Sequence, residues 1–406
     1  MRISILPSIL FAATVVVIGC GGSTTYAPSA AFHSGTTGST TTTGTTTGTT
    51  TGTTGTTGTT GTTTGTTGTT GTTGTTGTTG TPVGTSSAAA INDSNFVVGT
   101  ANDGTNSHAV MFLVGKNTAP TKYQVTDIGN LGGADTVVNG INVVGNCTGF
   151  SVTAGNASHA FMYTFALATM ADCGALPGFG GSNGRAINDN SEVAGDSFFG
   201  PNVKGFHWDS THGIKYVADP LSTSLSGCYG ISPSGVMVGV YDDGLTSYLP
   251  WSSTVAGPAV DLSLYVIPGF AHGMNAAGLI VGDSGGNGAW TLDSMTHAVT
   301  QLPTTNIAVP TAVAINSGGV CVGSDTFGTT IHAVMWQAGK EVDLGARGLS
   351  SVLDLNTLLP AGSLQVSGDY LTGATGINAS GQICGNTFFH HAVILTPVSA
   401  GIVRKR

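Results

Sequence analysis

The chain has 406 residues, and only 8% of them are charged, against about a quarter in ordinary soluble domains. It contains 20 Asp and Glu but 11 Lys and Arg, so its formal net charge is −9. This balance excludes a basic surface of the kind that binds nucleic acid, because the one basic cluster is the terminal RKR.

Residues 1–19 have the features of a secretory leader. Arg2 supplies the positive end, and the apolar run ILFAATVVVI is too short for a comfortable membrane span. The leader ends in VIGC, residues 17–20, which resembles the bacterial lipobox. The resemblance implies that Cys20 becomes the acylated first residue and anchors the protein at the cell envelope, at the outer membrane or cell surface. The alternative is a chance cysteine after an ordinary signal peptide.

Residues 20–82 contain a low-complexity segment, Gly35–Thr81, built almost wholly from Thr and Gly. Such a segment has too little apolar surface to offset the entropy of ordering, so we expect a disordered tether. Treated as a flexible coil, it has a reach of roughly 40 Å. We interpret it as a spacer that holds a domain away from a membrane.

Residues 83–406 repeat one nine-residue phrase. The copies begin at an Ile-Asn step or its variant, and a shortened copy, INVVG, begins at Ile141. The full copies are INDSNFVVG, INDNSEVAG, ISPSGVMVG, MNAAGLIVG, INSGGVCVG and INASGQICG. The starts are separated by 50, 46, 44, 43, 41 and 62 residues. Recurrence in this range is typical of propellers and solenoids.

Each copy is predicted to form a strand, a tight turn and a second strand. Asn at the first turn position caps the turn, and Gly at the fourth supplies the left-handed conformation. Asn95 and Ser191 replace that Gly in two copies. The residues after the turn are apolar in succession, which indicates a strand covered on both faces.

Two further phrases complete each unit. A HAF-like strand follows the hairpin, and an Asp-containing strand ends most units. The aromatic residues of the HAF-like strands are expected in equivalent places: Phe112, Tyr163, Trp208, Trp251, Trp290 and Trp336. Four strands repeated seven times predict an all-β fold, a seven-bladed β-propeller of four-stranded antiparallel blades, with six or eight blades as alternatives.

The units resemble the HAF repeats of bacterial extracellular proteins. The resemblance rests on the order IN-x-x-G-x-VVG, then HAF, then DLG, and on the C-terminal stretch DLNTLLPAGS, LTGATGINASGQICG and HAVILTP. It covers about residues 85–398 and implies an exported, propeller-like protein of a family without an established activity. The chain departs from the pattern in units three to five, where the His is lost.

The recurring His and Asp residues are predicted to be structural. Each His should bond to backbone or to the Asp of its own unit, as a brace between strands. A ligand-binding arc and a metal site are the alternatives for the histidines. The residues are His108, His159, His332 and His391, with Asp127, Asp172 and Asp343.

Two other signals are weak. The VGDSGG stretch, Val281 to Gly286, matches the nucleophile segment of trypsin-like proteases, but it aligns with hairpin ends in other units. Five cysteines besides Cys20 form no CxxC pair, and Cys321 and Cys384 stand where other copies have small apolar residues. We therefore expect neither proteolysis nor a cofactor or metal.

The sequence predicts a surface-displayed, lipid-anchored propeller that binds a polysaccharide or a protein and is not an enzyme. Its contacts should be a membrane, through the N-terminal lipid, and that ligand, with no nucleic acid and with a monomeric chain. The alternatives are an extracellular enzyme acting on glycans, which would need clustered carboxylates or a charged His on one rim, and a purely structural envelope protein.

Overall fold

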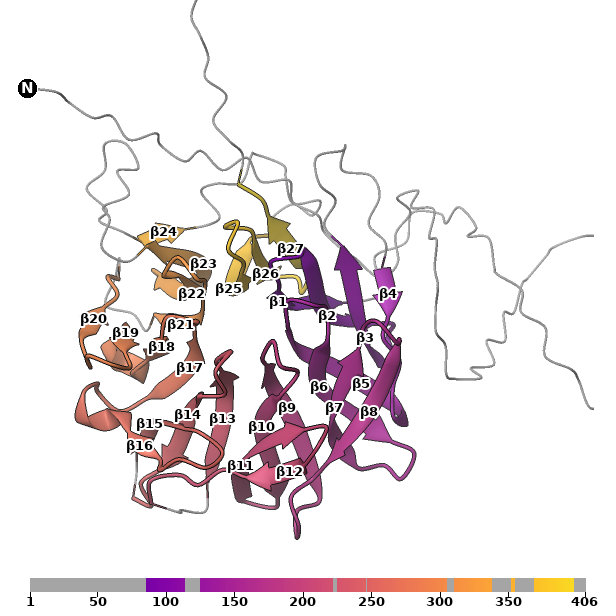
Figure 1. The fold of residues 1–406 in the computed structure, drawn as a ribbon. Coiled ribbons are helices and arrows are strands. Elements are labelled where there is room, and N and C mark those ends of the chain that lie inside the picture. Colours follow the sequence, from indigo (N-terminus) through magenta and orange to yellow (C-terminus); the bar gives the residue numbers. More distant parts are fainter. Residues whose placement is uncertain are drawn as a thin grey trace, which may run out of the picture.

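A computed structural model of the chain describes residues 85–113, 125–221, 225–245, 247–304, 310–337, 352–354 and 369–397. These residues form seven antiparallel sheets arranged as a ring around a central axis (Figure 1). The predicted seven-bladed β-propeller is therefore confirmed. Within these residues no helix is both long and apolar enough to cross a bilayer. The leader, Cys20 and the Thr/Gly tether lie outside the described residues.

Each blade is one stretch of chain whose strands pair in sequence order. Blade 1 contains β1 (Ser86–Ile91), β2 (Phe96–Asn102), β3 (Ser107–Leu113) and β4 (Val125–Asp127). Blade 2 contains β5 (Gly132–Ile141), β6 (Cys147–Thr153), β7 (Ser158–Thr164) and β8 (Thr169–Gly174). Blade 3 contains β9 (Gly181–Ile187), β10 (Val193–Phe199), β11 (Asn202–Asp209) and β12 (Gly213–Tyr216).

The remaining blades follow the same order. Blade 4 contains β13 (Ser226–Ile231), β14 (Met237–Asp242), β15 (Tyr248–Ser253) and β16 (Val260–Asp261), followed by η1 (Leu262–Leu264). Blade 5 contains β17 (Phe270–Met274), β18 (Leu279–Asp283), η2 (Gly285–Asn287), β19 (Ala289–Asp293) and β20 (Val299–Gln301). Blade 6 contains β21 (Thr311–Ile315), β22 (Val320–Phe327), β23 (Thr330–Gln337) and β24 (Val352–Asp354). Blade 7 has three described strands, β25 (Leu371–Ile377), β26 (Ile383–Thr387) and β27 (Ala392–Leu395).

The hydrophobic core is divided into seven clusters, and each cluster joins two neighbouring blades. The cluster between blades 7 and 1, for example, packs Cys384 and Ile394 against Val97 and Phe112. The five described cysteines are buried free thiols, and each belongs to one of these clusters. The second strand of each blade is covered on both faces, as its run of apolar residues predicts.

The Ile-Asn turns have the expected geometry. In blade 1 the Oδ1 atom of Asn92 accepts from the backbone N–H of Ser94 at 3.1 Å and of Phe96 at 2.9 Å. Asn95 and Ser191 have φ values of 67° and 63°, so they replace glycine in the left-handed region as predicted. The asparagine therefore caps its own turn.

The same asparagines also join the blades to one another, a role that the sequence did not suggest. The Nδ2 group of each donates to a backbone carbonyl in the next turn around the ring. The bonds are Asn92 to Asn142 (2.8 Å), Asn142 to Asn188 (3.0 Å), Asn188 to Ser232 (3.1 Å), Asn275 to Asn316 (3.1 Å), Asn316 to Asn378 (3.0 Å) and Asn378 to Asn92 (3.1 Å). Blade 4 carries Ser232 at this place, and its shorter side chain bonds within its own turn instead.

The ring closes through the contacts that join other neighbouring blades. The backbone N–H of Ala392 in blade 7 donates to Ser86 Oγ in blade 1 at 3.1 Å, as Ala160 in blade 2 donates to Ser182 Oγ in blade 3 at 2.8 Å. Figure 1 shows the yellow C-terminal blade beside the indigo N-terminal one. The first and last blades therefore meet by side-chain and backbone contacts at an ordinary blade junction.

A glycine in each second strand allows a bulge in the facing first strand. A Cβ on Gly323 would lie 1.9 Å from the carbonyl oxygen of Thr311, which no side chain tolerates. The equivalent glycines are equally crowded by backbone: Gly99, Gly149, Gly195, Gly239, Gly282 and Gly385. Opposite each of them the register shifts by one residue, which leaves one residue of the first strand unpaired.

The strand register corrects the predicted aromatic column. Phe112 lies opposite Val97, but Trp251 lies opposite the glycine of its blade, Gly239, and Trp290 likewise lies opposite Gly282. These two tryptophans therefore stand two residues earlier in their strands than Phe112 does. The physical reason is space, because the glycine has no side chain and a Cβ at Gly282 would lie 2.5 Å from the indole of Trp290.

The asparagine links should contribute measurably to stability. We expect Asn378→Ala to lower the free energy of unfolding by about 1–3 kcal/mol, because it leaves the buried carbonyl of Asn92 and the turn N–H of Gln382 without their partner. Chemical denaturation of the purified protein measures the change. Ser232→Asn is the matched opposite change and should raise stability by about 0.5–1.5 kcal/mol, since it restores the amide that the other blades carry. Equal stability of Asn378→Ala and the natural protein would contradict the role of the link.

Candidate functional site

The two ends of the ring differ in the chain segments that form them. In each blade the first and third strands run in one direction and the second runs in the other, since all pairs are antiparallel. The hairpins between second and third strands and the segments entering the first strands therefore share one end, which we call the hairpin end. The Ile-Asn turns and the connections between third and fourth strands form the opposite end, the turn end.

The unpaired bulge residues form a column around the inside of the ring. Each lies two residues before the Ile-Asn step, and none is buried although its neighbours in the strand pack between blades. The column consists of Ala89, Asn139, Arg185, Tyr229, His272, Val313 and Thr375. Large polar and aromatic side chains occur together on blades 3 to 5, and smaller ones occur elsewhere. Aligning the repeats on the Ile-Asn step shows this variable column, so the sequence held a signal for it.

The column residues on blades 3 to 5, Arg185, Tyr229 and His272, form one cluster that crosses neighbouring blades. Arg185 Nε donates to Asp196 Oδ1 at 2.7 Å, and its guanidinium carbon lies 5.4 Å from the ring centroid of Tyr229. His272 Nε2 lies 2.5 Å from Asp283 Oδ2. Asp196 and Asp283 each follow the second-strand glycine of their blade, and both aspartates are buried. Each cation or imidazole of the cluster is thus held by a carboxylate of its own blade.

Phe270 lies beside two rings of this cluster. The centroids of Tyr229, Phe270 and His272 are 5.9, 6.2 and 6.4 Å apart, and their planes lie within 23° of one another. The three rings are therefore nearly parallel, and each pair is stacked. Burial raises the pKa of Tyr229 above its usual range, so its hydroxyl remains protonated at neutral pH. The arrangement can pack against a flat ligand and donate a hydrogen bond to it.

The predicted braces have a regular place at the hairpin end. His108 Nδ1 lies 3.2 Å from Asp127 Oδ2, and His159 Nδ1 lies 2.9 Å from Asp172 Oδ2. Blade 3 has no histidine at this place. It carries Lys204 at the same register, opposite Ser197, and the Nζ atom of Lys204 lies 3.3 Å from an oxygen of the Asp219 carboxylate. Sequence inspection missed this pair because Lys precedes the GFHW phrase by one residue.

The other two predicted histidines contact groups from other parts of their blades. His391 Nδ1 lies 3.0 Å from Asp369 Oδ2, so its carboxylate comes from the segment that enters blade 7 and not from a fourth strand. His332 Nε2 lies 3.1 Å from Thr330 Oγ1. Asp343 lies outside the described residues. The fourth strand of its blade is β24, where the backbone of Asp354 pairs with that of Val334, as the backbone of Asp127 pairs with that of Val110. The brace role of Asp343 stays a prediction.

The VGDSGG stretch ends a blade hairpin, as its alignment with the other repeats predicts. Asp283 closes β18, and Ser284 Oγ donates to the backbone carbonyl of Ile267 at 3.0 Å. His272 contacts Asp283, so the described structure does not pair this histidine with the serine hydroxyl. Within the described residues, no three His, Cys, Asp or Glu side chains form a set that could hold a metal ion.

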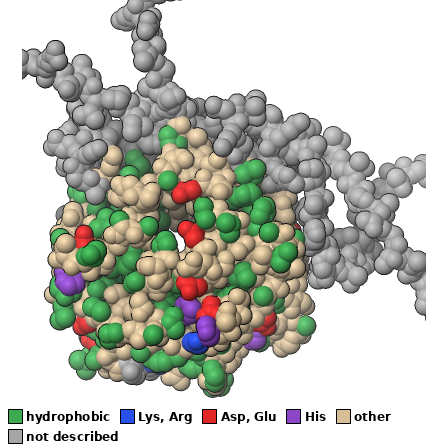
Figure 2. Space-filling model, in the orientation of Figure 1, with side chains coloured by type: hydrophobic (Ala, Val, Ile, Leu, Met, Phe, Trp, Pro, Cys, Tyr) green, Lys and Arg blue, Asp and Glu red, His purple; other side chains and the backbone are tan. Residues whose placement is uncertain are grey.

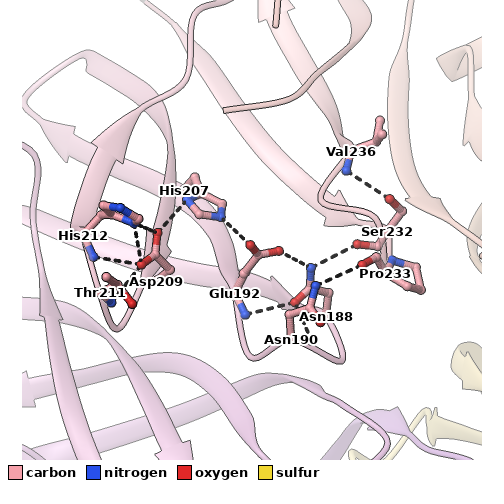
Figure 3. A network of polar contacts seen from close by, with 10 residues as sticks. All are labelled: Asn188, Asn190, Glu192, His207, Asp209, Thr211, His212, Ser232, Pro233 and Val236. Carbon is pink, nitrogen blue, oxygen red and sulfur yellow. Dashed lines mark hydrogen bonds and ion pairs between the residues drawn. The ribbon is translucent and has the colours of Figure 1, made fainter. Parts of the chain in front are cut away.

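A buried histidine lies near the turn end of blade 3 (Figure 3). His207 is 2% exposed, and among the described residues neither ring nitrogen has a hydrogen-bond partner. Its Nε2 lies 3.8 Å from Glu192 Oε1 and its Nδ1 lies 4.0 Å from Asp209 Oδ2. Glu192 in turn accepts from Asn188, which makes one of the links between blades. Burial lowers the pKa of His207, while the two carboxylates oppose that effect.

Exposed apolar side chains are prominent at the hairpin end. Blades 3, 4, 6 and 7 each present at least one on the hairpin between their second and third strands. They are Phe198, Phe199, Leu245, Tyr248, Ile331, Phe388 and Phe389. Figure 2 shows one face of the ring, where acidic side chains gather near the centre and basic ones are few. Apolar and uncharged polar side chains cover most of the face that Figure 2 shows.

Comparison with known proteins supports the fold of this chain and does not identify its activity. No protein-family model matches the chain, and no curated protein matches its sequence. Virginiamycin B lyase from Staphylococcus aureus is similar in structure, with 12% identity and a TM-score of 0.50, over 77% of this chain and 95% of that one. The propeller domain of the Trilobed protease from Pyrococcus furiosus has 8% identity and a TM-score of 0.48, over 79% and 99%. TolB from Acinetobacter baumannii has 13% identity and a TM-score of 0.38, and the match covers 63% of this chain and 61% of TolB. The likeness to virginiamycin B lyase supports the propeller fold alone.

His207 should make the stability of the protein depend on pH. Its pKa in the folded chain is below the usual 6.5, so the unfolded chain binds the proton more readily. Stability should be complete above about pH 6.5 and should fall as the pH drops toward the folded pKa. His207→Met places the residue of the equivalent positions Met111, Met162 and Met335 there and should flatten this dependence.

The measurement is the melting temperature of both proteins between about pH 8 and about pH 5. Other titrating groups act in both proteins, so the difference between the curves isolates His207. Lys215 and His212 also lower its pKa, and neither is changed by this substitution. Parallel curves would show that burial does not disfavour the charged imidazole.

Proposed function

We propose that this chain is a binding or adhesion propeller, displayed at the cell envelope by a lipid on Cys20, with a polysaccharide or a protein as its partner. The observation that carries the proposal is the gathering of half-exposed aromatic side chains on the hairpins of one end. Such side chains are costly to leave in water in a protein with so few charges, and aromatic residues are enriched where proteins bind partners.

The polar groups of the hairpin end support binding over catalysis. His108, His159, Lys204 and His391 each have a carboxylate partner that fixes strands or entering segments of a blade. A glycan hydrolase would need a pair of carboxylates facing one bond, and the aspartates of these braces lie on four different blades, each beside its own His or Lys. An enzyme acting on glycans and a purely structural envelope protein are the alternatives that the tests below separate.

Removing the exposed rings should abolish binding. The full-length protein is screened against a glycan array and against immobilised envelope proteins, and the combined variant Phe199→Ser, Tyr248→Ser and Phe389→Ser should lose most of the signal. The matched control replaces Leu167 and Met295 with serine, because these exposed side chains lie at the turn end. Release of a product from any bound glycan would contradict the non-enzymatic proposal. Absence of any partner would favour the structural alternative.

The anchor is tested separately. Cys20→Ser should move the protein from the membrane fraction to the soluble fraction, because a processed end with more than one acyl chain anchors stably and a protein without one does not. Fractionation followed by mass spectrometry of the N-terminal peptide measures both the location and the modification. Retention of the variant in membranes would contradict anchoring through Cys20.

A further inference from the structure

The junction between blades 7 and 1 differs from the others because the two ends of the propeller meet there. At five other junctions the segment that connects the blades places a buried apolar side chain between them. These side chains are Ile128, Leu176, Val217, Leu262 and Leu302. Blades 7 and 1 are not consecutive in the chain, and the described residues form a groove of about 970 Å³ at their junction.

We propose that this groove is a binding site for an uncharged stretch of polysaccharide. The proposal rests on the proposed binding function and names its ligand class. The groove runs from the first strands, at Ser87 and Thr372, to the hairpins at Asn102 and Phe389. It therefore opens at the hairpin end and extends outward from the centre of the ring.

The chemistry of the lining matches a neutral sugar. Hydroxyl and amide side chains form most of it, and no Asp, Glu, Lys or Arg is among the described lining residues. Hydroxyls both donate and accept, as the hydroxyls of a sugar require, and no buried charge has to be neutralised by the ligand.

Two aromatic rings form one edge of the groove. Phe388 is 52% exposed and Phe389 is 42% exposed, and their centroids lie 5.3 Å apart with the rings nearly perpendicular. Phe388 also stacks on Tyr370 at 5.2 Å, so its position is fixed by packing. An apolar ring beside hydroxyl and amide groups suits a sugar, which presents C–H groups on its faces and hydroxyls at its edges.

The walls of the groove are held in place before any ligand binds. The backbone N–H of Ser86 donates to the carbonyl of His390 at 2.8 Å, and Asn386 Oδ1 accepts from the N–H of Ala88 at 2.8 Å. These bonds cross between the two blades. A site formed in advance loses less conformational entropy on binding, which favours affinity for a flexible chain.

Size and charge favour a glycan strand over the other partners. The groove volume falls in the range of roughly 300–1,000 Å³ that is typical of small-ligand pockets, whereas a stable protein partner buries about 800 Å² on each side. The chain has a net charge of −9, so an acidic polysaccharide would approach against repulsion. A neutral glycan strand is not repelled by the net charge of the chain, and it does not need the contact area of a protein partner.

Isothermal titration of the full-length protein tests the proposal. The probes are dextran, mannan and cellulose oligosaccharides as neutral glycans, and alginate and polygalacturonate as acidic ones. Ser87→Glu places a charge on an exposed position of the groove, and Phe389→Ala removes half of its aromatic edge. Each should weaken binding of a neutral glycan about tenfold or more. Phe165→Ala is the matched control, because this phenylalanine is as exposed as Phe389 but lies at the turn end of blade 2, and it should change the affinity less than about twofold.

Melting temperatures close to that of the natural protein show that the variants are folded. Failure to bind any neutral glycan would overturn the proposal, and so would binding that neither groove variant weakens. Those results would leave the binding function in place if the combined hairpin-end variant still abolished capture of an acidic glycan or a protein. Loss of binding in the groove variants with retention in the Phe165→Ala control supports the site.

Discussion

The bond from one turn asparagine to the next blade is the interaction on which the ring depends. Its amide oxygen satisfies the turn of its own blade, and its amide nitrogen satisfies a buried carbonyl of the neighbour. A buried carbonyl without a donor is costly, so adjacent turns are tied together at a fixed spacing. The bond from Asn378 to Asn92 repeats this link where the chain ends meet. Because each sheet is thin and apolar on both faces, it is stable only between two neighbours, and the seven inter-blade clusters supply that burial.

This frame leaves one position in each blade outside the strand pairing. The glycine of the second strand admits the bulge, and the bulge leaves one residue of the first strand without a paired residue opposite it. The residue is free to differ from blade to blade, and it is Ala89 in the first blade, Tyr229 in the fourth and Val313 in the sixth. The side chain at this position can therefore change without disturbing the strand ladder, although Asn139 and Thr375 use it for a hydrogen bond to the next blade.

The two ends of the ring carry different kinds of side chain for the same reason. The Ile-Asn turns are committed to joining blades, so their sequence is restricted. The hairpins at the other end have fewer such duties, and they carry exposed rings in blade 3 and blade 7 while blade 2 has the short polar turn around Asn156. A groove lies at the hairpin end between the first and last blades, because no connecting segment of the chain joins those two blades directly.

The sequence by itself determined the repeat, the strand–turn–strand unit, the left-handed positions at Asn95 and Ser191, and the number of blades, because these depend on local spacing and backbone preference. Tertiary structure decided the rest. The donation from each asparagine to the next blade, the Lys204–Asp219 pair and the partner of His391 need residues that are distant in the chain. The positions of Trp251 and Trp290 depend on strand register, since these two indoles lie opposite Gly239 and Gly282, whereas Trp208 and Trp336 lie opposite Val193 and Cys321. Local patterns cannot report such contacts, because they exist only once neighbouring blades have packed.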